Sequence, residues 1–288
     1  MSRDVDTDVY PPPTKRRRFV KGVVGASALV GLAAIGETAV DLTTNPTGEG
    51  GGVTEYYGID VVGGPAPRGM PQIPVEIDDE GYLRGIWPPV ETAGGGAEAA
   101  PIARTQLGGI TYSNEWFQYC GVEIAPGLDP TADEDNYFRY AESSQYEWQN
   151  QEVSPNDRVN VDDFEDYETW GNGIGQDGVG KPAVATWRST NVEDDAAAVI
   201  PVQLIRSVRV ERAAQESRWL GASTQEGFIA ILDKCTHFCC VPGYKIDPVS
   251  ARYGAANGIY CPCHQSVYDP FVVSRQSFVA FPRPEGEE

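Results

Sequence analysis

Cysteine and histidine side chains gather in two short segments near the C-terminus. The segment "DKCTHFCCVPGYK" covers residues 233–245, and "YCPCHQSVYD" covers residues 260–269. Together they hold five of the chain's six cysteines and both of its histidines. Thiolate sulfur and imidazole nitrogen are ligands that zinc and iron take in proteins. The two segments therefore predict a metal centre assembled from both.

The order of the potential ligands limits the kind of metal site. Cys235 and His237 form a C-x-H pair, Cys261 and His264 form a C-x-x-H pair, and 23 residues separate the two pairs. Zinc can take two cysteines and two histidines, but such sites usually space the cysteines together and the histidines together. The mixed pairs argue against zinc, and the C-x-C-H order argues against attached haem, which needs C-x-x-C-H. A framework of disulfides alone needs no histidine at ligand spacing.

These residues resemble the signature of Rieske iron–sulfur proteins of quinol-oxidising cytochrome bc and b6f complexes. That signature reads C-T-H-x-x-C-V-P and C-P-C-H-x-S-x-Y-D, and residues 235–242 and 261–269 match it at thirteen positions. The resemblance implies one [2Fe–2S] cluster per chain, with two cysteines on one iron and two histidines on the other. The ligands that it implies are Cys235, His237, Cys261 and His264.

The resemblance also assigns roles to residues beside the cluster. Cys240 and Cys263 match the pair that forms a disulfide between the two loops. Ser266 matches a serine that donates its hydroxyl to a bridging sulfide, and Tyr268 matches a tyrosine that donates to the Sγ of Cys235. Both hydrogen bonds draw charge from the cluster, so both residues are expected to raise its reduction potential.

The two histidines would make this centre an acceptor of both electrons and protons. Imidazoles are neutral ligands, so a cluster with two of them is less negative and easier to reduce than one held by four thiolates. By resemblance, His237 and His264 lie at the exposed tip of the loops, and one of them accepts a hydrogen bond from quinol. Coupled uptake of an electron and a proton suits quinol oxidation.

The chain departs from the family pattern around the first loop. Phe238 and Cys239 stand where the pattern commonly has Leu-Gly, so Cys239 is an extra thiol beside the predicted cluster. It is free, pairs with Cys120, or competes with Cys240 for Cys263, and the sequence leaves these alternatives open. The insert between the two loops is longer than is usual, so residues 247–258 are expected to bulge outward.

Short β-like runs separated by turns fill the C-terminal part of the chain. They cover residues 181–189, 200–205, 227–233, 258–262, 267–273 and 277–282. Runs of this length and spacing predict a mainly β fold, a sandwich or a barrel. The resemblance narrows this to a Rieske-type antiparallel β-sandwich over residues 158–288, with a small cluster-binding subdomain at 233–270.

The N-terminus has the layout of an export signal. A basic cluster precedes the uncharged apolar run at 22–36, and "KRRRFVK" at 15–21 resembles the twin-arginine signal through Arg16 and Arg17. We expect a cytoplasmic tail over 1–21 and a signal or membrane anchor over 22–40. A retained anchor is favoured over a cleaved signal, and the charge asymmetry places the Rieske domain of a single-pass protein on the extracytoplasmic side of the cell membrane.

The long segment between the anchor and the predicted β domain is less informative. Residues 41–105 are rich in Gly, Pro and acids, and we interpret them as a linker or an irregular wrapping segment. Residues 106–157 are dense in aromatic side chains, which indicates packing against something that the sequence does not identify. The predicted organisation therefore has an irregular, partly unassigned acidic region over 41–157.

Charge composition restricts the partners. The chain has 42 acidic and 22 basic residues, a net charge of −20, and only five of the basic residues are Lys. Such a surface repels phosphate backbones, so nucleic acid is excluded as a partner. An acidic, Lys-poor composition favours a halophilic protein, whose charges are screened in concentrated salt, over an ordinary acidic one. We expect a haloarchaeal member of the family.

The function that the resemblance implies is electron transfer within a membrane complex. The chain would be the iron–sulfur subunit of a quinol-oxidising complex, with a cytochrome b-type subunit beside it and cytochrome c or a blue copper protein as acceptor. It would be a redox subunit and not a complete enzyme alone. The alternative is the Rieske small subunit of an exported molybdenum oxidoreductase, similar to arsenite oxidase. The second cysteine pair, Cys240 and Cys263, argues against a soluble Rieske ferredoxin or oxygenase component.

Overall fold

The computed structural model describes residues 52–94, 100–190, 192 and 198–280, which belong to one compact unit, Thr44–Glu288. The twin-arginine motif at Arg16 and Arg17 and the anchor at 22–40 lie outside the described residues. Within the described ranges, no helix has the length and apolar character needed to cross a membrane. The export and anchoring hypotheses therefore stay predictions.

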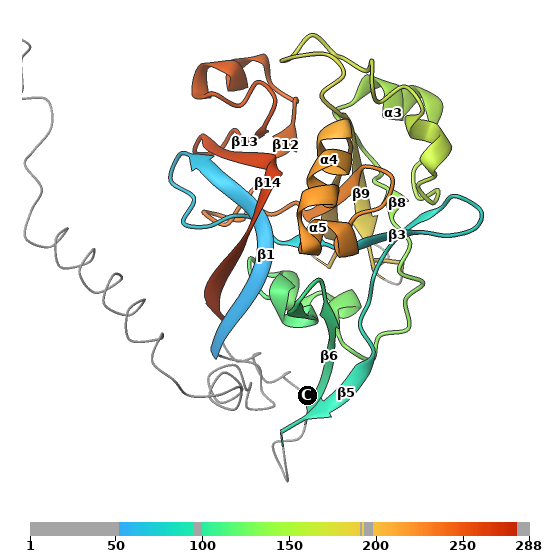
Figure 1. Ribbon diagram of the computed structural model, residues 1–288, viewed down its shortest axis with the longest axis vertical. Coiled ribbons are helices and arrows are strands. Elements are labelled where there is room, and N and C mark those ends of the chain that lie inside the picture. The colour runs from blue at the N-terminus through green and yellow to red at the C-terminus, as the bar shows by residue number, and fades with distance from the viewer. Residues whose placement is uncertain (1–51, 95–99, 191, 193–197, 281–288) are drawn as a thin grey trace, which may run out of the picture. The chain divides into compact units, whose positions relative to one another are not determined.

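The described chain is mainly β, and its strands pair antiparallel in four sheets (Figure 1). The five-stranded sheet has the order β2 (Gln72–Ile73), β11 (Phe228–Leu232), β10 (Ile200–Arg206), β9 (Lys181–Trp187) and β8 (Arg139–Tyr140). The four-stranded sheet has the order β1 (Gly52–Gly63), β14 (Ser266–Ala280), β13 (Ile259–Cys261) and β12 (Gly243–Tyr244). The two smaller sheets join β3 (Val75–Ile77) to β4 (Leu83–Gly85), and β5 (Val90–Ala93) to β6 (Ala100–Leu107) and β7 (Ile110–Ser113).

Helices are short and lie between the strands. The α-helices are α3 (Glu147–Glu152), α4 (Val208–Glu216) and α5 (Arg218–Ser223). The 3₁₀ helices are η3 (Asn114–Phe117), η4 (Val122–Ile124), η5 (Pro126–Leu128), η6 (Val161–Phe164) and η7 (Pro248–Tyr253). Helix α4 begins where the Ser207 hydroxyl accepts from the amide of Arg209, and α5 begins at a second serine cap, Ser217. The helix η7 occupies the insert at 247–258, which was expected to bulge and is largely exposed.

The predicted strands are confirmed in the C-terminal half, with one difference. The runs at 181–189, 200–205, 227–233 and 258–262 become β9, β10, β11 and β13. The runs expected at 267–273 and 277–282 are one strand, β14, of 15 residues. The two runs look separate in the sequence because the polar residues 274–276 lie between them, although these three residues also pair with β1. The pairing is irregular at Pro270, inside the first run, where Ile59 pairs with Val273 and Asp60 pairs with Asp269. Proline has no amide hydrogen to donate to a ladder, so it is accommodated at such a bulge.

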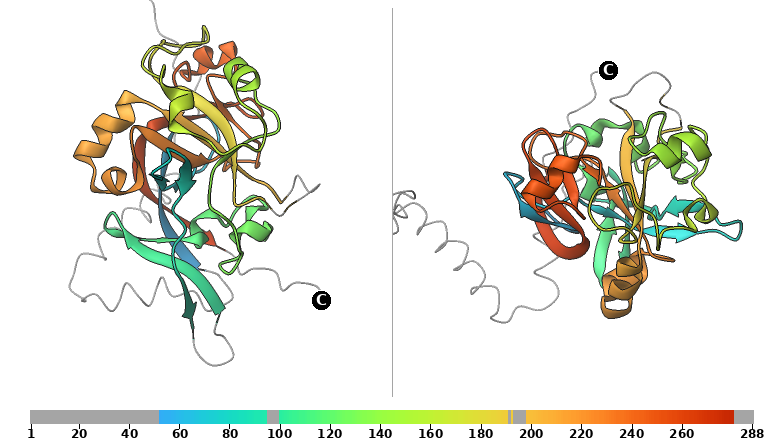
Figure 2. Two further views of the ribbon diagram at one scale, coloured as in Figure 1. Left: turned by 90° about the vertical axis from the view of Figure 1, so that its right-hand side faces the viewer. Right: turned by 90° about the horizontal axis from the view of Figure 1, so that it is seen from above.

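The linker interpretation of residues 41–105 is wrong for the part that the structure describes. Residues 52–63 form β1, which pairs with β14 along its length, from Gly52 opposite Ala280 to Gly63 opposite Val267. Figures 1 and 2 show these two strands side by side, although they lie at opposite ends of the described sequence. The glycine clusters on either side dominate the composition, but the run "VTEYYGIDVV" between them has the β-branched and aromatic residues of a strand.

The aromatic residues of 106–157 pack against one face of the five-stranded sheet, which identifies their unassigned partner. Trp187 lies at the end of β9. The centroid of its ring is 5.6 Å from that of Phe117 and 6.3 Å from that of Phe138. Residues 106–157 therefore share a core with β9, β10 and β11. The expected boundary at 157/158 does not separate two cores, because this one contains residues from both sides of it.

Strand β11 separates two cores and leads directly into the first cysteine segment. Its five residues are all buried, and they alternate between faces because side chains on a strand point to opposite sides. Phe228, Ala230 and Leu232 belong to the aromatic core, whereas Ile229 and Ile231 belong to a second core on the opposite face. That second core also contains side chains of the four-stranded sheet. We term residues 233–269 the head and the other described residues the body.

Candidate metal centre

The first cysteine segment is a compact loop between β11 and β12. The amide of Cys239 donates to the carbonyl of Cys235 at 2.9 Å, and the amide of Cys235 donates to the carbonyl of Cys240 at 2.8 Å. Cys239 has a φ of +60°, a left-handed conformation that glycine adopts most easily. The family pattern has a glycine at this position. The loop is therefore folded back on itself, with His237 and Phe238 at its outer turn.

The second cysteine segment is a tight hairpin between β13 and β14. Cys261 and Ser266 are paired across the two strands, and the amide of Gln265 donates to the carbonyl of Cys261 at 2.9 Å. Residues 262–265 form the exposed tip of this hairpin. Gly64, just after β1, lies directly against it, since a Cβ there would come within 2.3 Å of the Gln265 carbonyl oxygen. Local backbone hydrogen bonds thus hold the conformation of both segments.

The four predicted ligands come together in two pairs. Cys235 and Cys261 are free thiols, each 1% exposed. The pKa of Cys235 is lowered to about 5, first because the Cys261 thiol donates to its thiolate, and the same shared proton raises the pKa of Cys261. The rings of His237 and His264 have centroids 4.8 Å apart. The cysteines form an inner pair and the histidines an outer, more exposed pair.

Two buried polar atoms near these pairs have no partner within the described chain. They are the Nδ1 of His237 and the Oγ of Ser266, a residue that is 0% exposed. Buried polar groups are nearly always hydrogen-bonded or bound to an ion, so an unpartnered pair beside free thiols points to a missing ligand. An iron–sulfur cluster suits both atoms, because an imidazole nitrogen can ligate iron and a hydroxyl can donate to a sulfide.

The hydroxyl of Tyr268 is placed where it could donate to the Sγ of Cys235, as expected of a residue that raises the reduction potential of a cluster. Its hydroxyl lies 3.1 Å from the Sγ of Cys235 and accepts from the amide of Thr236 at 3.3 Å. Burial raises the pKa of Tyr268, so the hydroxyl keeps its proton. A protonated hydroxyl beside a thiolate is a donor, which stabilises negative charge on Cys235.

Two disulfides connect the first loop to other parts of the chain. Cys240 pairs with Cys263, the pairing that the resemblance implied. Cys239 pairs with Cys120, which was one of the three alternatives that the sequence left open. The even number of cysteines carried a signal for this second bond: two ligands and one disulfide leave two of six cysteines to pair.

The sulfurs of Cys240, Cys261 and Cys263 lie within 4.8 Å of one another. This trio is not a metal site by itself, because two of its sulfurs are bonded to each other and offer no thiolate. Its significance is that the loop-to-loop disulfide lies directly beside one of the free thiols. The disulfide therefore restricts the separation of the two ligand loops at the position of the candidate cluster.

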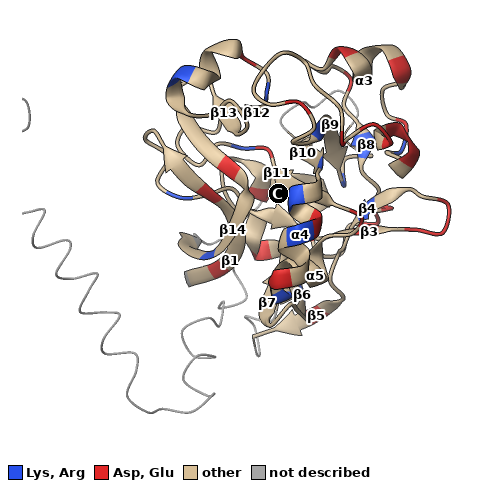
Figure 3. Cartoon of the chain, turned by 45° about the horizontal axis from the view of Figure 1, so that its top comes forward, with Lys and Arg blue, Asp and Glu red and all other residues tan. Residues whose placement is uncertain are grey.

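The two cysteine loops of the head carry no charged side chain, although the chain as a whole is strongly acidic. Residues 235–244 and 259–268 contain no Asp, Glu, Lys or Arg, whereas acids lie on many other elements (Figure 3). Phe238 is 66% exposed, and its ring centroid lies 4.4 Å from that of His237 and 5.1 Å from that of His264. Val241 is also exposed. The histidine rings thus belong to a small apolar patch.

Asp233, at the start of the head, is also kept neutral. It is 1% exposed, and neither carboxylate oxygen has a hydrogen-bond partner within the described chain. Burial raises the pKa of Asp233 well above its usual range, so its carboxyl group is protonated. The interior under the first loop therefore adds no negative charge close to the free thiols.

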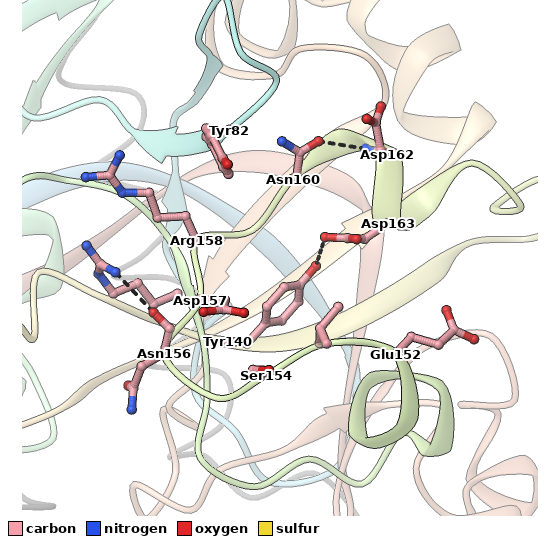
Figure 4. A pocket seen from close by; sticks show the side chains of 12 residues that line it. Tyr82, Tyr140, Glu152, Ser154, Asn156, Asp157, Arg158, Asn160, Asp162 and Asp163 are labelled. Carbon is pink, nitrogen blue, oxygen red and sulfur yellow. Dashed lines mark hydrogen bonds between the residues drawn. The ribbon is translucent and has the colours of Figure 1, made fainter.

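A separate pocket of about 700 Å³ is lined by residues of the body alone. Figure 4 shows the side chains that line it. Its lining includes four acids, Glu152, Asp157, Asp162 and Asp163, together with other polar side chains. Asp163 accepts from Tyr140 at 2.8 Å, and Arg139 donates to the carbonyl of Asn156 at 3.0 Å. No cysteine or histidine lines it. The head is therefore the site where residues suited to metal chemistry converge.

In comparisons with known proteins, no family model, no curated protein and no solved structure matches the chain. A family assignment therefore rests on the thirteen signature positions and on the arrangement of their side chains.

Proposed function

We propose that this chain is a Rieske-type iron–sulfur protein in which one [2Fe–2S] cluster is held by Cys235, His237, Cys261 and His264. The observation that carries the proposal is the convergence of two buried free thiols with two adjacent imidazoles, on loops joined by a disulfide. The mainly β body with a small loop-built head supports the finer assignment to the Rieske-type sandwich.

Several residues of the head would have distinct parts in such a centre. When bound, the cluster would supply reversible one-electron chemistry. Cys235 and Cys261, both buried, would supply the two thiolates that bind one iron. The Nδ1 of His237 is the buried nitrogen of its ring, which leaves Nε2 to exchange a proton with solvent or a donor. The Tyr268 hydroxyl lies 3.1 Å from the Sγ of Cys235, and the Ser266 hydroxyl, which has no partner within the described chain, would donate to a sulfide of the cluster.

The proposed role is electron transfer from quinol in a membrane complex. The exposed Phe238 ring lies beside both histidines, and the loop that carries it has no charged residue from 235 to 244. Such an apolar surface suits contact with a cytochrome b-type subunit and a hydrophobic quinol. The acceptor is cytochrome c or a blue copper protein. Attachment to the cell membrane, with this domain on the extracytoplasmic side, belongs to the same proposal and depends on residues 22–40.

An EPR spectrum of the reduced protein tests the cluster assignment. We expect two iron and two sulfide per chain and the low average g value of mixed histidine and cysteine ligation. His264→Cys is expected to retain iron and to lower the midpoint potential, because a neutral ligand becomes a thiolate. The matched control is Gln265→Asn, an adjacent exposed position whose positive φ tolerates Asn. Zinc in place of iron, or an unchanged potential in His264→Cys, would overturn the assignment.

Purification of the native complex from its membrane tests the role. A b-type haem spectrum in the purified complex, with quinol-dependent reduction of the cluster, is expected. Molybdenum without haem b would identify the chain instead as the small subunit of a molybdenum oxidoreductase.

A further inference from the structure

Residues from the body hold the first ligand loop at three points. Tyr119 donates its hydroxyl to the carbonyl of Lys234 at 2.9 Å. Thr236, between the two ligands of the loop, donates its hydroxyl to the carbonyl of Arg68 at 2.5 Å. Cys239 is bonded to Cys120. The loop is therefore attached to the body at its beginning, its middle and its end.

Two of these attachments, those of Tyr119 and Thr236, meet at Arg68. Its guanidinium lies 4.7 Å from the ring centroid of Tyr119, 4.2 Å from that of Phe278 and 5.5 Å from that of Tyr56. A cation held against three aromatic rings is well fixed, because each ring face attracts it. Arg68 thus links β1 and β14 to the segment that carries Tyr119 and Cys120.

The two disulfides connect the first loop to different parts of the molecule. Cys240–Cys263 joins the first loop to the second loop, and both belong to the head. Cys120–Cys239 joins the first loop to the body, across 119 residues of sequence. The sulfur of Cys120 also lies 3.6 Å from the carbonyl oxygen of Cys235, a contact and not a hydrogen bond, since a disulfide sulfur carries no hydrogen. The Cys120 side of the bond therefore touches the backbone of a ligand residue.

We propose that Arg68, Tyr119 and Cys120 are positioning residues that fix the first ligand loop on the body, so that the cluster is retained independently of the loop-to-loop disulfide. This inference rests on the proposed function. Because Cys235 and His237 lie between the attachment points at Lys234 and Cys239, the loop keeps its ligand geometry even when the second loop is displaced.

Pairing with Cys120 also keeps Cys239 from reacting with the neighbouring disulfide. A free Cys239 thiolate could attack the Sγ of Cys263, which would form a Cys239–Cys263 bond and release Cys240 as a thiolate. That exchange conserves electrons and needs no outside oxidant. The observed pairing with Cys120 removes the attacking thiolate.

The rate of cluster loss tests the proposal in the purified, cluster-containing protein. An iron chelator is added, and the visible absorption and circular dichroism of the cluster are followed with time. The variants are Cys120→Ser/Cys239→Gly, in which glycine suits the positive φ, the single Cys120→Ser, and Tyr119→Phe. The control is Tyr112→Phe, which removes a similar bond, from the Tyr112 hydroxyl to the carbonyl of Ile86, elsewhere in the aromatic core.

The double variant is expected to lose its cluster roughly tenfold faster than the wild type, because the loop loses its covalent link to the body. Cys120→Ser is expected to be faster still, with a Cys239–Cys263 peptide found by mass spectrometry. Tyr119→Phe is expected to be about two- to fivefold faster, and Tyr112→Phe unchanged. Equal rates in the wild type and the double variant would overturn the proposal, and Tyr119→Phe decides it if the cysteine variants do not fold.

Hydrogen exchange of the cluster-free protein separates this proposal from the proposed function. Amides of residues 233–242 are expected to exchange faster in the double variant, while those of β9 to β11 keep their protection and show that the body is folded. A wild type without an iron–sulfur signal would end the functional proposal alone. Unchanged exchange in 233–242 would end the positioning proposal alone.

Discussion

The body and the head are stabilised in different ways. The body has a large core in which aromatic rings cover one face of the five-stranded sheet, and many of its side chains are fully buried. The head has few buried apolar side chains beyond the second core and a small cluster of Ala255, Tyr260 and Val267. It is stabilised instead by two disulfides and by hydrogen bonds to the loop backbone. Apolar burial makes the body cooperative, whereas covalent links let the head keep polar, reactive side chains near its surface.

The largest effect is expected from removing a ring in the body. Trp187 is 0% exposed and contacts Trp87, Phe117 and Phe138. Trp187→Ala should lower the free energy of unfolding by about 3–5 kcal/mol, through lost burial and a residual cavity. Urea denaturation followed by circular dichroism measures it. The control Ile124→Ala removes an apolar side chain that is 65% exposed and should change stability by less than about 0.5 kcal/mol. Similar changes in the free energy of unfolding for the two variants would contradict the view that the aromatic core stabilises the body.

A smaller and local effect is expected from removing the loop-to-loop disulfide. Replacing Cys240 and Cys263 together with Ser should destabilise the head by roughly 3 kcal/mol, given their sequence separation of 23 residues. Hydrogen exchange should rise in residues 233–245 and 258–269 and stay unchanged in β9 and β10. Equal loss of protection in the body would show that the head and the body unfold together.

Tyr268→Phe should have a modest effect with a specific signature. The ring stays in the second core, but the hydroxyl near the Sγ of Cys235 is lost, which should cost about 1 kcal/mol. In the cluster-containing protein the midpoint potential should fall by tens of mV, since about 59 mV corresponds to a tenfold change for one electron. Tyr244→Phe is the matched control, because the Tyr244 hydroxyl is buried without a partner and its removal should be neutral or stabilising. Potentiometric titration that shows equal potentials for both variants would contradict the tuning role.

The smallest effect on stability is expected at the exposed tip. Phe238→Ser replaces a ring that is 66% exposed, so the free energy of unfolding should change by less than about 0.5 kcal/mol. Cluster content should also be unchanged, while quinol-dependent reduction in the purified complex should slow, because the apolar patch around the histidines is reduced. A normal rate of reduction would show that the patch does not contact the partner.

The candidate site was more predictable from sequence than the fold around it. The Cys240–Cys263 pairing that the resemblance implied is present, and the two cysteines and two histidines that it named as ligands lie in adjacent loops. Their role as metal ligands stays a prediction. Strand β1 was missed because its partner lies more than 200 residues away and no turn links them. The partner of Cys239 could not be chosen, because the pairing depends on how the aromatic segment folds onto the sheet. The salt-adapted surface and the anchor remain predictions.

The pairing of β1 with β14 gives this ladder one end far from the candidate site and one end beside it. Gly52 pairs with Ala280, whereas Gly63 pairs with Val267, three residues after His264. Fraying that began at the pair of Gly52 and Ala280 would have to break the pairs along β14 before it reached the histidines. Local opening at that end of the ladder thus leaves the tip of the head in place.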